Sequence, residues 1–360
     1  MKKNYISALA VLACVAVFCT ISGNSFHQMR TATEEIIPGE GVTEVRMLSD
    51  YFPDLAGTAG DTQIYVLQGE QEGGSCLILG GTHANELGGH MGAVLFVENA
   101  KVEAGTLYVI PRTNNSAFTH NDPQEGHPRT VHITTDEGNV REFIHGSRAT
   151  NPVDQWPDPD VYVNYMGQSL SGSENRNINR TYPGKADGTL TEMMSYGIVQ
   201  LINTENIDVT VDLHEASPEY PVINALIAHE RAMNLASNVV VDMQMEGVQI
   251  SLEPSPTDLR GLTHRELGDH TDTLALLMEA PNPAQGRLRD RTDEALVLTG
   301  KSETYVKAGE IGQLYVPYDE NGWPIEVRCA RHVFGIERIL ANYSEMYEEP
   351  IIVTGMPSYD

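Results

Sequence analysis

A short apolar strand that runs into two glycines, and then into a histidine and a glutamate, most constrains this chain. Residues 76–86 read Cys-Leu-Ile-Leu-Gly-Gly-Thr-His-Ala-Asn-Glu. The glycines let the backbone turn sharply where the strand ends, and His83 and Glu86 then lie one helical turn apart. Imidazole nitrogens and carboxylate oxygens are ligands of Zn²⁺. The segment therefore predicts a fold that presents two metal ligands at the end of a strand.

A second strand of the same design lies far downstream and ends on another histidine. Residues 207–214 read Ile-Asp-Val-Thr-Val-Asp-Leu-His, an alternating β-branched run. With His83 and Glu86, His214 meets the count of three protein ligands that a catalytic zinc takes, leaving a fourth position for water. The alternative for the first pair alone is a surface helix start, where Glu86 merely favours the N-terminal dipole.

Two further segments add charged groups that suit catalysis. Residues 174–184 read Glu-Asn-Arg-Asn-Ile-Asn-Arg-Thr-Tyr-Pro-Gly, and their guanidinium groups can grip a carboxylate or polarise a carbonyl. Later, the apolar run 273–278 leads straight into Glu279. A carboxylate at the mouth of a buried strand is partly desolvated, which raises its pKa toward the range of a general base. The alternatives are a solvated polar loop and a strand-end charge that reaches solvent.

Strand and helix patterns alternate along the chain. Strands are predicted at 62–67, 75–80, 106–111, 208–213, 222–228 and 273–279. Helices are predicted at 86–99, 190–204, 229–246 and 327–345. The alternation predicts an α/β sheet with helices on both faces. Ligands in such folds sit at the carboxyl ends of strands, where His83, His214 and Glu279 all fall.

Four motifs follow one another along the chain: the His83–Glu86 pair, the segment 174–184, the strand that ends on His214 and the strand that ends on Glu279. In that order they resemble the succinylglutamate desuccinylase and aspartoacylase family, relatives of the zinc metallocarboxypeptidases. Residues 183–192, Pro-Gly-Lys-Ala-Asp-Gly-Thr-Leu-Thr-Glu, are similar to that family too. The resemblance covers residues 60 to 345. It implies a single catalytic domain with a mixed, mostly parallel central sheet of the zinc-carboxypeptidase type. It also implies one zinc ion per chain, bound by His83, Glu86 and His214.

The resemblance implies roles for the other motif residues. Asn179 and Arg180 would hold the substrate's carboxylate, and Glu279 would activate the water bound to zinc. The family also uses an arginine upstream of its Asn-Arg pair to polarise the scissile carbonyl. Arg176 is the candidate for that role, and the alternatives are Arg112 and Arg148.

Two local features bear on how these residues would bind a substrate. The family's Asp-Leu-Asn-Arg is here Asn-Ile-Asn-Arg at 177–180, which removes one negative charge beside the pocket. The polar cluster 261–270, just before the Glu279 strand, offers Arg265 or His264 as a further substrate-binding residue. The alternative for this cluster is a helix-capping turn with surface charges.

The formal net charge of the chain argues against polyanionic partners. It is -27, from 23 basic and 50 acidic residues. Nucleic acid would be repelled except at a local basic patch, so we expect no nucleic-acid partner. An anionic substrate would need a local arginine cluster such as Arg176 and Arg180.

The N-terminus predicts export from the cytoplasm. Lys2 and Lys3 precede an apolar run from Ile6 to Ile21 that gives way to Ser-Gly-Asn-Ser. Such a segment is typical of a signal peptide, and its length is near the lower limit of a membrane-spanning helix. Residues 1–25 are therefore either a cleaved signal or a membrane anchor, and the chain is expected to work outside the cytoplasm.

The predicted organisation places one catalytic domain behind this segment. An irregular lead-in occupies 26–60, the zinc hydrolase domain 61–346, and a C-terminal tail 347–360. Within the domain, 114–175 is a long polar insertion, and loops of that length are usually functional or mobile. We interpret it as a wall or lid beside the arginine motif.

These features together predict a zinc-dependent amide hydrolase that deacylates an N-acyl amino acid or a similar small amide. One alternative is a metallocarboxypeptidase that removes a C-terminal residue from a peptide or cell-wall stem. Another is a non-catalytic extracytoplasmic zinc-binding protein, which would not need Glu279 or the arginine motif. The expected partners are a small amide or short peptide, with possible membrane anchoring through the N-terminal segment.

Overall fold

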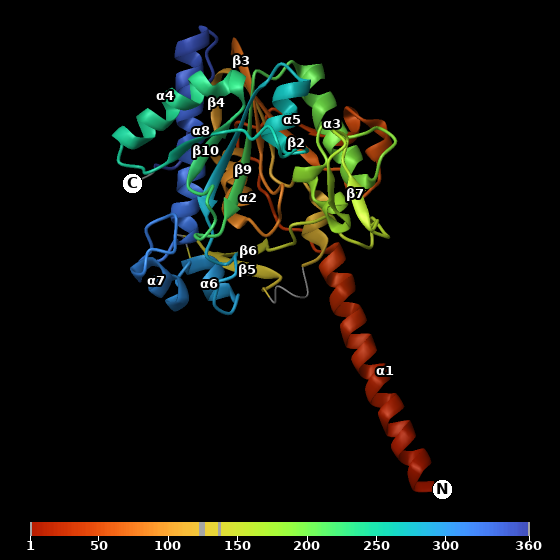
Figure 1. Ribbon diagram of the computed structural model, residues 1–360. Helices are drawn as coiled ribbons and strands as arrows, with labels where there is room; N and C mark the ends of the chain where they lie inside the picture. Colours follow the sequence, from red (N-terminus) through yellow and green to blue (C-terminus); the bar gives the residue numbers. More distant parts are fainter. Residues whose placement is uncertain (1, 122–126, 136–137, 359–360) are drawn as a thin grey trace.

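Within residues 2–121, 127–135 and 138–358, which the computed structural model describes, a nine-stranded sheet runs through the molecule (Figure 1). Its strand order is β1-β2-β4-β3-β9-β12-β10-β11, and β13 pairs with β4. The strands are β1 Glu44–Met47, β2 Gln63–Gln68, β3 Gln71–Leu79, β4 Lys101–Ile110, β9 Val209–Ala216, β10 Ala225–Ala228, β11 Ser251–Pro254, β12 Leu274–Pro281 and β13 Ile352–Thr354.

The middle of the sheet is parallel and its flanks are mixed. The four central strands are parallel to one another: β4 pairs with β3, β3 with β9, and β9 with β12. On one side β2 joins β4 antiparallel, and on the other β10 joins β12 antiparallel while β11 runs parallel to β10. The prediction of an α/β fold with a mixed, mostly parallel sheet is confirmed.

Helices cover both faces of the sheet, as the sequence pattern predicts. One face packs on α2 (Leu87–Asn99), α4 (Met233–Met245) and α8 (Ile325–Tyr347). The other packs on α3 (Leu190–Glu205) and on α5 (Thr263–His270). Alternation along β9 sends Val209, Val211 and Leu213 into the first core, so Asp212 and His214 lie on the opposite face. Burial of the strand's apolar residues thus fixes where its polar residues point.

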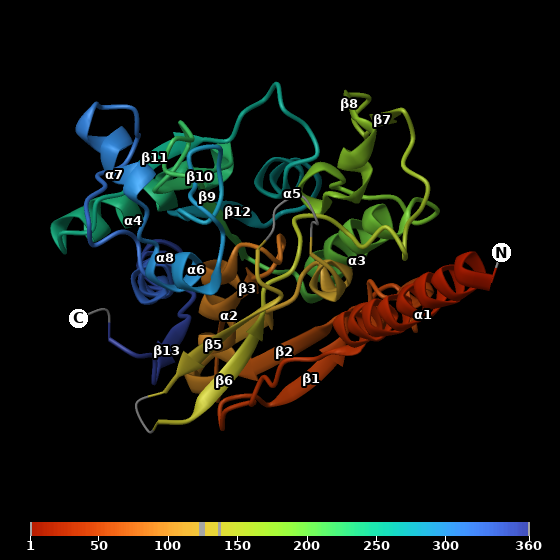
Figure 2. The same cartoon turned by 90° about the horizontal axis from the view of Figure 1, so that it is seen from below.

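The polar insertion 114–175 carries two small sheets. The hairpin of β5 (Thr130–Thr134) and β6 (Val140–Ile144) lies beside α6 (Glu294–Thr299), below the large sheet (Figures 1 and 2). The backbone N–H of His132 donates to Glu294, 2.6 Å away, and joins the two elements. The hairpin of β7 (Val161–Val163) and β8 (Ser169–Ser171) lies on the α3 side (Figure 2). A further helix, α7 (Glu303–Glu310), follows α6 in the chain.

The N-terminal helix α1 (Lys2–Thr31) projects away from the body (Figure 1). Among the described residues, Asn4–Thr31 is the one helical stretch long and apolar enough to cross a membrane. Its apolar side chains from Tyr5 to Phe26 are exposed. At its foot, Arg30 pairs with Asp154 of the polar insertion at 2.6 Å. After it, the segment expected to be irregular up to residue 60 contributes β1 to the sheet.

Candidate metal centre

The turn after β3 is shaped so that its histidine and glutamate approach the sheet. Gly81 has a positive φ of 62°, a backbone conformation that residues with a side chain rarely adopt. A Cβ on Gly80 would lie 2.6 Å from the Cβ of Ala93, so only glycine lets the strand end pass this close to α2. The chain then makes a turn in which the Glu86 N–H donates to the His83 carbonyl, 3.1 Å away. Glu86 is the residue that directly precedes α2.

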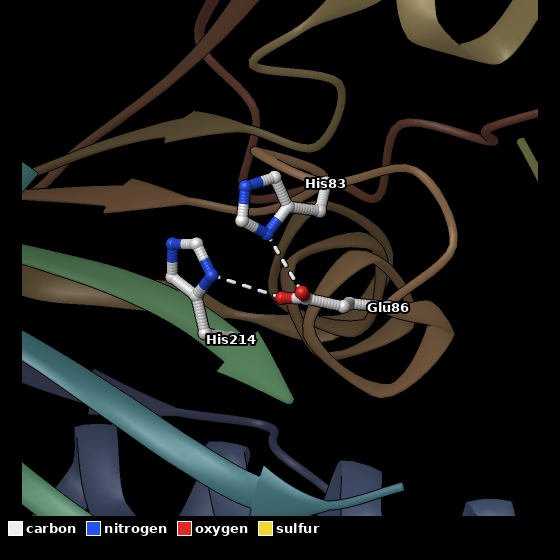
Figure 3. A group of neighbouring side chains, drawn as sticks. All are labelled: His83, Glu86 and His214. Carbon is white, nitrogen blue, oxygen red and sulfur yellow. Dashed lines mark hydrogen bonds and ion pairs between the residues drawn. The ribbon is translucent and has the colours of Figure 1, made fainter. Parts of the chain in front are cut away.

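His83, Glu86 and His214 converge at one place (Figure 3). Their ligand atoms all lie within 4.8 Å of one another, and all three side chains are buried. The two oxygens of Glu86 divide between the rings: Oε1 lies 2.6 Å from His83 Nδ1, and Oε2 lies 2.9 Å from His214 Nδ1. The rings are nearly perpendicular, at 79°, with centroids 4.7 Å apart.

The far nitrogen of each ring is held by an oxygen acceptor. His83 Nε2 lies 2.9 Å from Asn177 Oδ1, and His214 Nε2 lies 2.8 Å from Asp212 Oδ2. Asp212 is itself fixed by the Thr82 hydroxyl, which donates to Oδ1 at 2.6 Å. These acceptors favour the tautomer with hydrogen on Nε2, which turns each Nδ1 lone pair toward Glu86.

This donor set fits a divalent metal ion. Two Nδ1 lone pairs and a carboxylate meet at one point, and electron-pair donors approach this closely only around a proton or a cation. Burial lowers the pKa of His83 to about 4, so this ring is neutral. Burial also opposes charge on His214, but the adjacent Asp212 and Glu86 carboxylates outweigh it and raise the pKa of His214 well above its ordinary value. A metal ion at this point would replace the His214 proton.

A cavity of about 390 Å³ opens beside the three residues. Both polar and apolar side chains line it. The polar ones include Arg148, Asn179, Arg180, Glu253, His264 and Glu279, and the apolar ones include Val222, Ile227, Leu259, Leu262 and Leu277. The size and mixture suit a small ligand held by a few polar contacts.

Glu279 contributes a carboxylate to the lining of this cavity. It lies on β12 in register with His214 on the neighbouring strand β9. Its Oε2 is enclosed and has no hydrogen-bond partner among the described residues. Burial raises the pKa of Glu279 to about 8, although the positive charge of His214 opposes the shift. A carboxyl group with such a pKa can exchange a proton near neutral pH.

Asn179 and Arg180 present donors to the cavity. The Asn179 side-chain oxygen accepts from Thr263 twice, from its N–H at 2.9 Å and from its hydroxyl at 3.0 Å. The amide NH₂ of Asn179 has no partner among the residues described. Arg180 donates to the carbonyl of Asn179 at 2.7 Å. Burial, and then the charge of Arg148, lower the pKa of Arg180, so an anionic ligand would relieve an unfavourable positive environment.

The structure separates the three arginines considered for carbonyl polarisation. Arg148 lines the cavity, with its NH1 3.5 Å from His83 Nδ1 and 3.7 Å from Glu86 Oε1. Arg176 is absent from the lining and pairs through two hydrogen bonds with Asp158, at 2.7 and 2.9 Å. Arg112 lies over the ring of Phe118, 4.5 Å from its centroid.

In the 261–270 cluster, His264 and not Arg265 lines the cavity. Arg265 is tied to Glu230 at 2.6 Å and to Asp269 at 2.7 Å, on the far side of α5. His264 Nδ1 lies 2.7 Å from the Ser255 hydroxyl, and burial lowers the pKa of this histidine to about 3. His264 is therefore a neutral polar group of the wall.

Sequence reasoning gave no role to Asp212 and Asn177, which orient the two rings. Asp212 carried a readable signal, since it lies two residues before His214 and hence on the same face of a strand. Asn177 carried none, because its partner His83 is 94 residues away in the chain. Its contact depends on how the arginine segment folds back over the β3 turn.

Comparisons with known proteins give likeness of fold only. No protein-family model and no curated protein matches the chain. Solved structures similar to it include a succinylglutamate desuccinylase from a Silicibacter species, at 17% identity and a TM-score of 0.39, with 63% of this chain and 55% of that one covered. The cell shape determinant protein Csd4 from Helicobacter pylori matches at 14% identity and 0.48, with 83% and 57% covered.

A metallo-carboxypeptidase from Burkholderia cenocepacia matches at 11% identity and a TM-score of 0.47, with 89% of this chain and 68% of that one covered. The names agree with the resemblance seen in the motifs. The chain spans little more than half the length of the desuccinylase and of Csd4. Because every one of these scores is below 0.5, we base the function on the site itself.

Proposed function

We propose that this chain is a zinc-dependent amide hydrolase that releases the amine from a small N-acyl amino acid. The observation that carries the proposal is the position of Glu279. Its carboxylate, with an enclosed Oε2 that has no hydrogen-bond partner among the described residues, lies in register with His214, beside three converging candidate metal ligands and a cavity. A protein that only bound metal would gain nothing from an unpaired carboxylate buried there, because such a group costs stability.

The metal in the proposal is zinc, held by His83, Glu86 and His214. Two imidazoles and one carboxylate are a common ligand set of hydrolytic zinc sites, and such sites keep a further position open. When bound, Zn²⁺ supplies a Lewis acid that polarises a carbonyl oxygen and lowers the pKa of water. Asp212 and Asn177 keep the two rings in the orientation that this requires.

The residues of the cavity divide the remaining work. Glu279 accepts a proton from the attacking water at its carboxylate and delivers it to the leaving nitrogen. Arg148, the guanidinium nearest the ligand cluster, donates to the carbonyl oxygen as negative charge develops on it. Asn179 and Arg180 bind the carboxylate of the amino-acid part and thereby orient the amide. We thus assign carbonyl polarisation to Arg148 in place of Arg176, whose guanidinium is committed to Asp158.

A panel of substrates tests this function. Zinc-loaded, full-length protein in detergent is incubated with N-acetyl, N-succinyl and longer N-acyl amino acids and with short peptides, with and without chelator, and products are identified by mass spectrometry. Release of amines from the acyl amino acids, abolished by chelator, supports the proposal. Cleavage confined to peptide C-termini would assign the chain to carboxypeptidases, because the same Asn179–Arg180 clamp can receive a C-terminal carboxylate. Silence from both sets with zinc bound would contradict the hydrolase proposal.

We also propose that the protein works outside the cytoplasm, with α1 as its signal or anchor. The support is the exposed, apolar stretch Asn4–Thr31. Cell fractionation followed by mass determination of the mature chain checks this. Retention in the membrane at full mass indicates an anchor, a soluble shortened chain indicates a cleaved signal, and a cytoplasmic full-length chain would contradict export.

A further inference from the structure

A row of side chains leads away from Glu279 across the sheet and ends on another carboxylate. In the strand register, Leu277 of β12 is opposite Ile227 of β10, and Ile227 is opposite Glu253 of β11. In-register neighbours point to the same face of a sheet. That face also bears Glu279, two residues beyond Leu277 on β12, and His214, which is in register with Glu279 on β9. Leu277, Ile227 and Glu253 all line the cavity of about 390 Å³.

The first part of this row is an apolar floor. Leu277 and Ile227 are buried and pack with Ala225, and Val222 lies against them. Neighbouring strands lie roughly 4.8 Å apart, so the backbones of Leu277 and Glu253 are about 10 Å apart across β10. The floor therefore offers an aliphatic chain of several carbons a place to lie between the Glu279 strand and Glu253.

The end of the row is an uncompensated negative charge. The side chain of Glu253, on β11, makes no ion pair and no hydrogen bond with any residue that the structure describes. Two arginines of the lining pair elsewhere: Arg148 lies 3.7 Å from Glu86, and Arg180 lies 3.8 Å from Glu174. Glu253 also borders a neighbouring cavity of about 450 Å³ and is half-buried, so a charged group that meets it stays partly hydrated.

We propose that Glu253 determines specificity for an amine part that carries an ammonium group at the end of an aliphatic chain, as a lysine-like amino acid does. The aliphatic stem lies over Leu277 and Ile227, and the ammonium group pairs with Glu253. The α-carboxylate of the same amino acid is held by Asn179 and Arg180. This inference rests on the proposed function, since it names the substrate class of that hydrolase.

The first test compares two substrates, N-acyl-lysine and N-acyl-norleucine, which carry the same acyl group, one that the wild type cleaves. The two amino acids have the same number of carbon atoms, but only lysine has a terminal ammonium group. We expect the wild type to prefer the lysine amide at least tenfold in kcat/KM, and Glu253→Gln to bring the ratio of the two close to one. Glu253→Lys should shift the preference toward the glutamate amide. Glu246→Gln removes the same charge from an exposed position outside the cavity lining and should keep the wild-type ratio.

The second test measures binding without turnover. Calorimetry on the zinc-loaded, full-length protein gives the affinities of free L-lysine and free L-norleucine. We expect lysine to bind at least tenfold more tightly to the wild type, and this difference to vanish in Glu253→Gln. A wild type that binds both equally, or a Glu253→Gln variant that keeps the lysine preference, overturns the inference.

The two tests separate the failure of the specificity residue from the failure of the proposed function. Amides cleaved without regard to the ammonium group would leave the hydrolase standing and remove the role of Glu253. A lysine preference in binding that depends on Glu253, with no amide cleaved, would keep the subsite and remove the hydrolase.

Discussion

Two buried clusters of histidine and carboxylate flank α2, and they differ in how their charges are matched. In the first, His83 and His214 share Glu86 beside the cavity. In the second, His90 lies 2.8 Å from Glu34 through Nε2, and its Nδ1 lies 2.8 Å from the carbonyl oxygen of Pro111. The second cluster is as deeply buried as the first but takes no part in the cavity lining.

In the Glu34 cluster the ionisable side chains lie within ion-pair distance of one another. Oε2 of Glu34 accepts from the Ile144 N–H at 2.9 Å, and Arg112 lies 3.9 Å from Oε1. Burial opposes ionisation of Glu34, yet His90 and Arg112 outweigh it and lower the pKa of this carboxyl. Arg112 is thereby committed to a structural cluster, away from the cavity.

The cavity cluster is less evenly matched. His83 and His214 share the single carboxylate of Glu86, and the nearby Glu279 has a pKa raised to about 8 by burial. Burial and charge alone therefore do not distinguish a reactive site from a structural ion pair. The distinguishing property is a cavity beside the cluster, lined in part by Glu279, whose Oε2 has no hydrogen-bond partner among the described residues.

The largest effect is expected at Glu279. Replacement by glutamine keeps its size and removes the proton acceptor, so amide hydrolysis should fall roughly 100- to 10,000-fold. Steady-state rates, normalised to bound zinc, check this. Near-normal turnover with zinc bound would remove Glu279 as the base and weaken the contrast with Glu34, whose carboxylate lies within ion-pair distance of His90.

The Glu34→Gln variant tests the other side of the comparison. It removes the negative charge that faces His90 and the half-buried Arg112, so we expect the free energy of unfolding to fall by about 3 kcal/mol. Urea denaturation in detergent measures this loss. Zinc affinity should stay at the wild-type value, and a large loss of zinc from the folded variant would show that the two clusters are coupled.

Asp212 sharpens the comparison within the metal centre. Asparagine at this position removes the charge that orients the His214 ring, and loss of such a partner lowers metal affinity roughly 10- to 100-fold. Competition with a fluorescent chelator measures the affinity. Asp208→Asn is the matched control on the same segment, because Asp208 accepts from the Ser75 N–H at 2.7 Å and lies outside the cluster. Equal losses in both variants would argue for general destabilisation.

The smallest effect is the pH dependence of the Glu34 cluster. The pKa of Glu34 is lowered in the folded chain, so the unfolded state binds the proton more tightly. Its contribution is complete above the unfolded value of about 4.3 and is lost as the pH falls through the lower folded value. The stability gap between wild type and Glu34→Gln, measured across this range, should narrow toward acid. A stability difference that widens toward acid would mean that folding raises the pKa of Glu34, contrary to this account.

The fold was predictable because its signals are local. The apolar runs of β9 and β12 lead into His214 and Glu279, and His83 follows β3 after a short turn. Parallel strands bring their carboxyl ends to one edge of the sheet. The helices α2, α3, α4 and α8 begin and end within a few residues of the predicted bounds. Regular elements and strand-end residues follow from periodicity alone.

What could not be predicted depends on contacts between distant segments. The pairing of Arg176 with Asp158, and of Arg265 with Glu230, requires the paths of loops that have no periodicity. For polarisation of the carbonyl, Arg148 was only an alternative to Arg176. The segment around Arg148 carries no motif, and only the tertiary fold brings it to the cavity. Glu253 likewise gains its position from the pairing of β11 with β10.

The zinc content of three forms tests the central claim most directly. Wild type, Glu86→Gln and Glu34→Gln are equilibrated with zinc, freed of unbound metal and analysed by inductively coupled plasma mass spectrometry. We predict one zinc ion per chain in the wild type and in Glu34→Gln, and almost none in Glu86→Gln. Equal zinc in all three forms, or no zinc in the wild type, would contradict the assignment of His83, Glu86 and His214 as the metal centre.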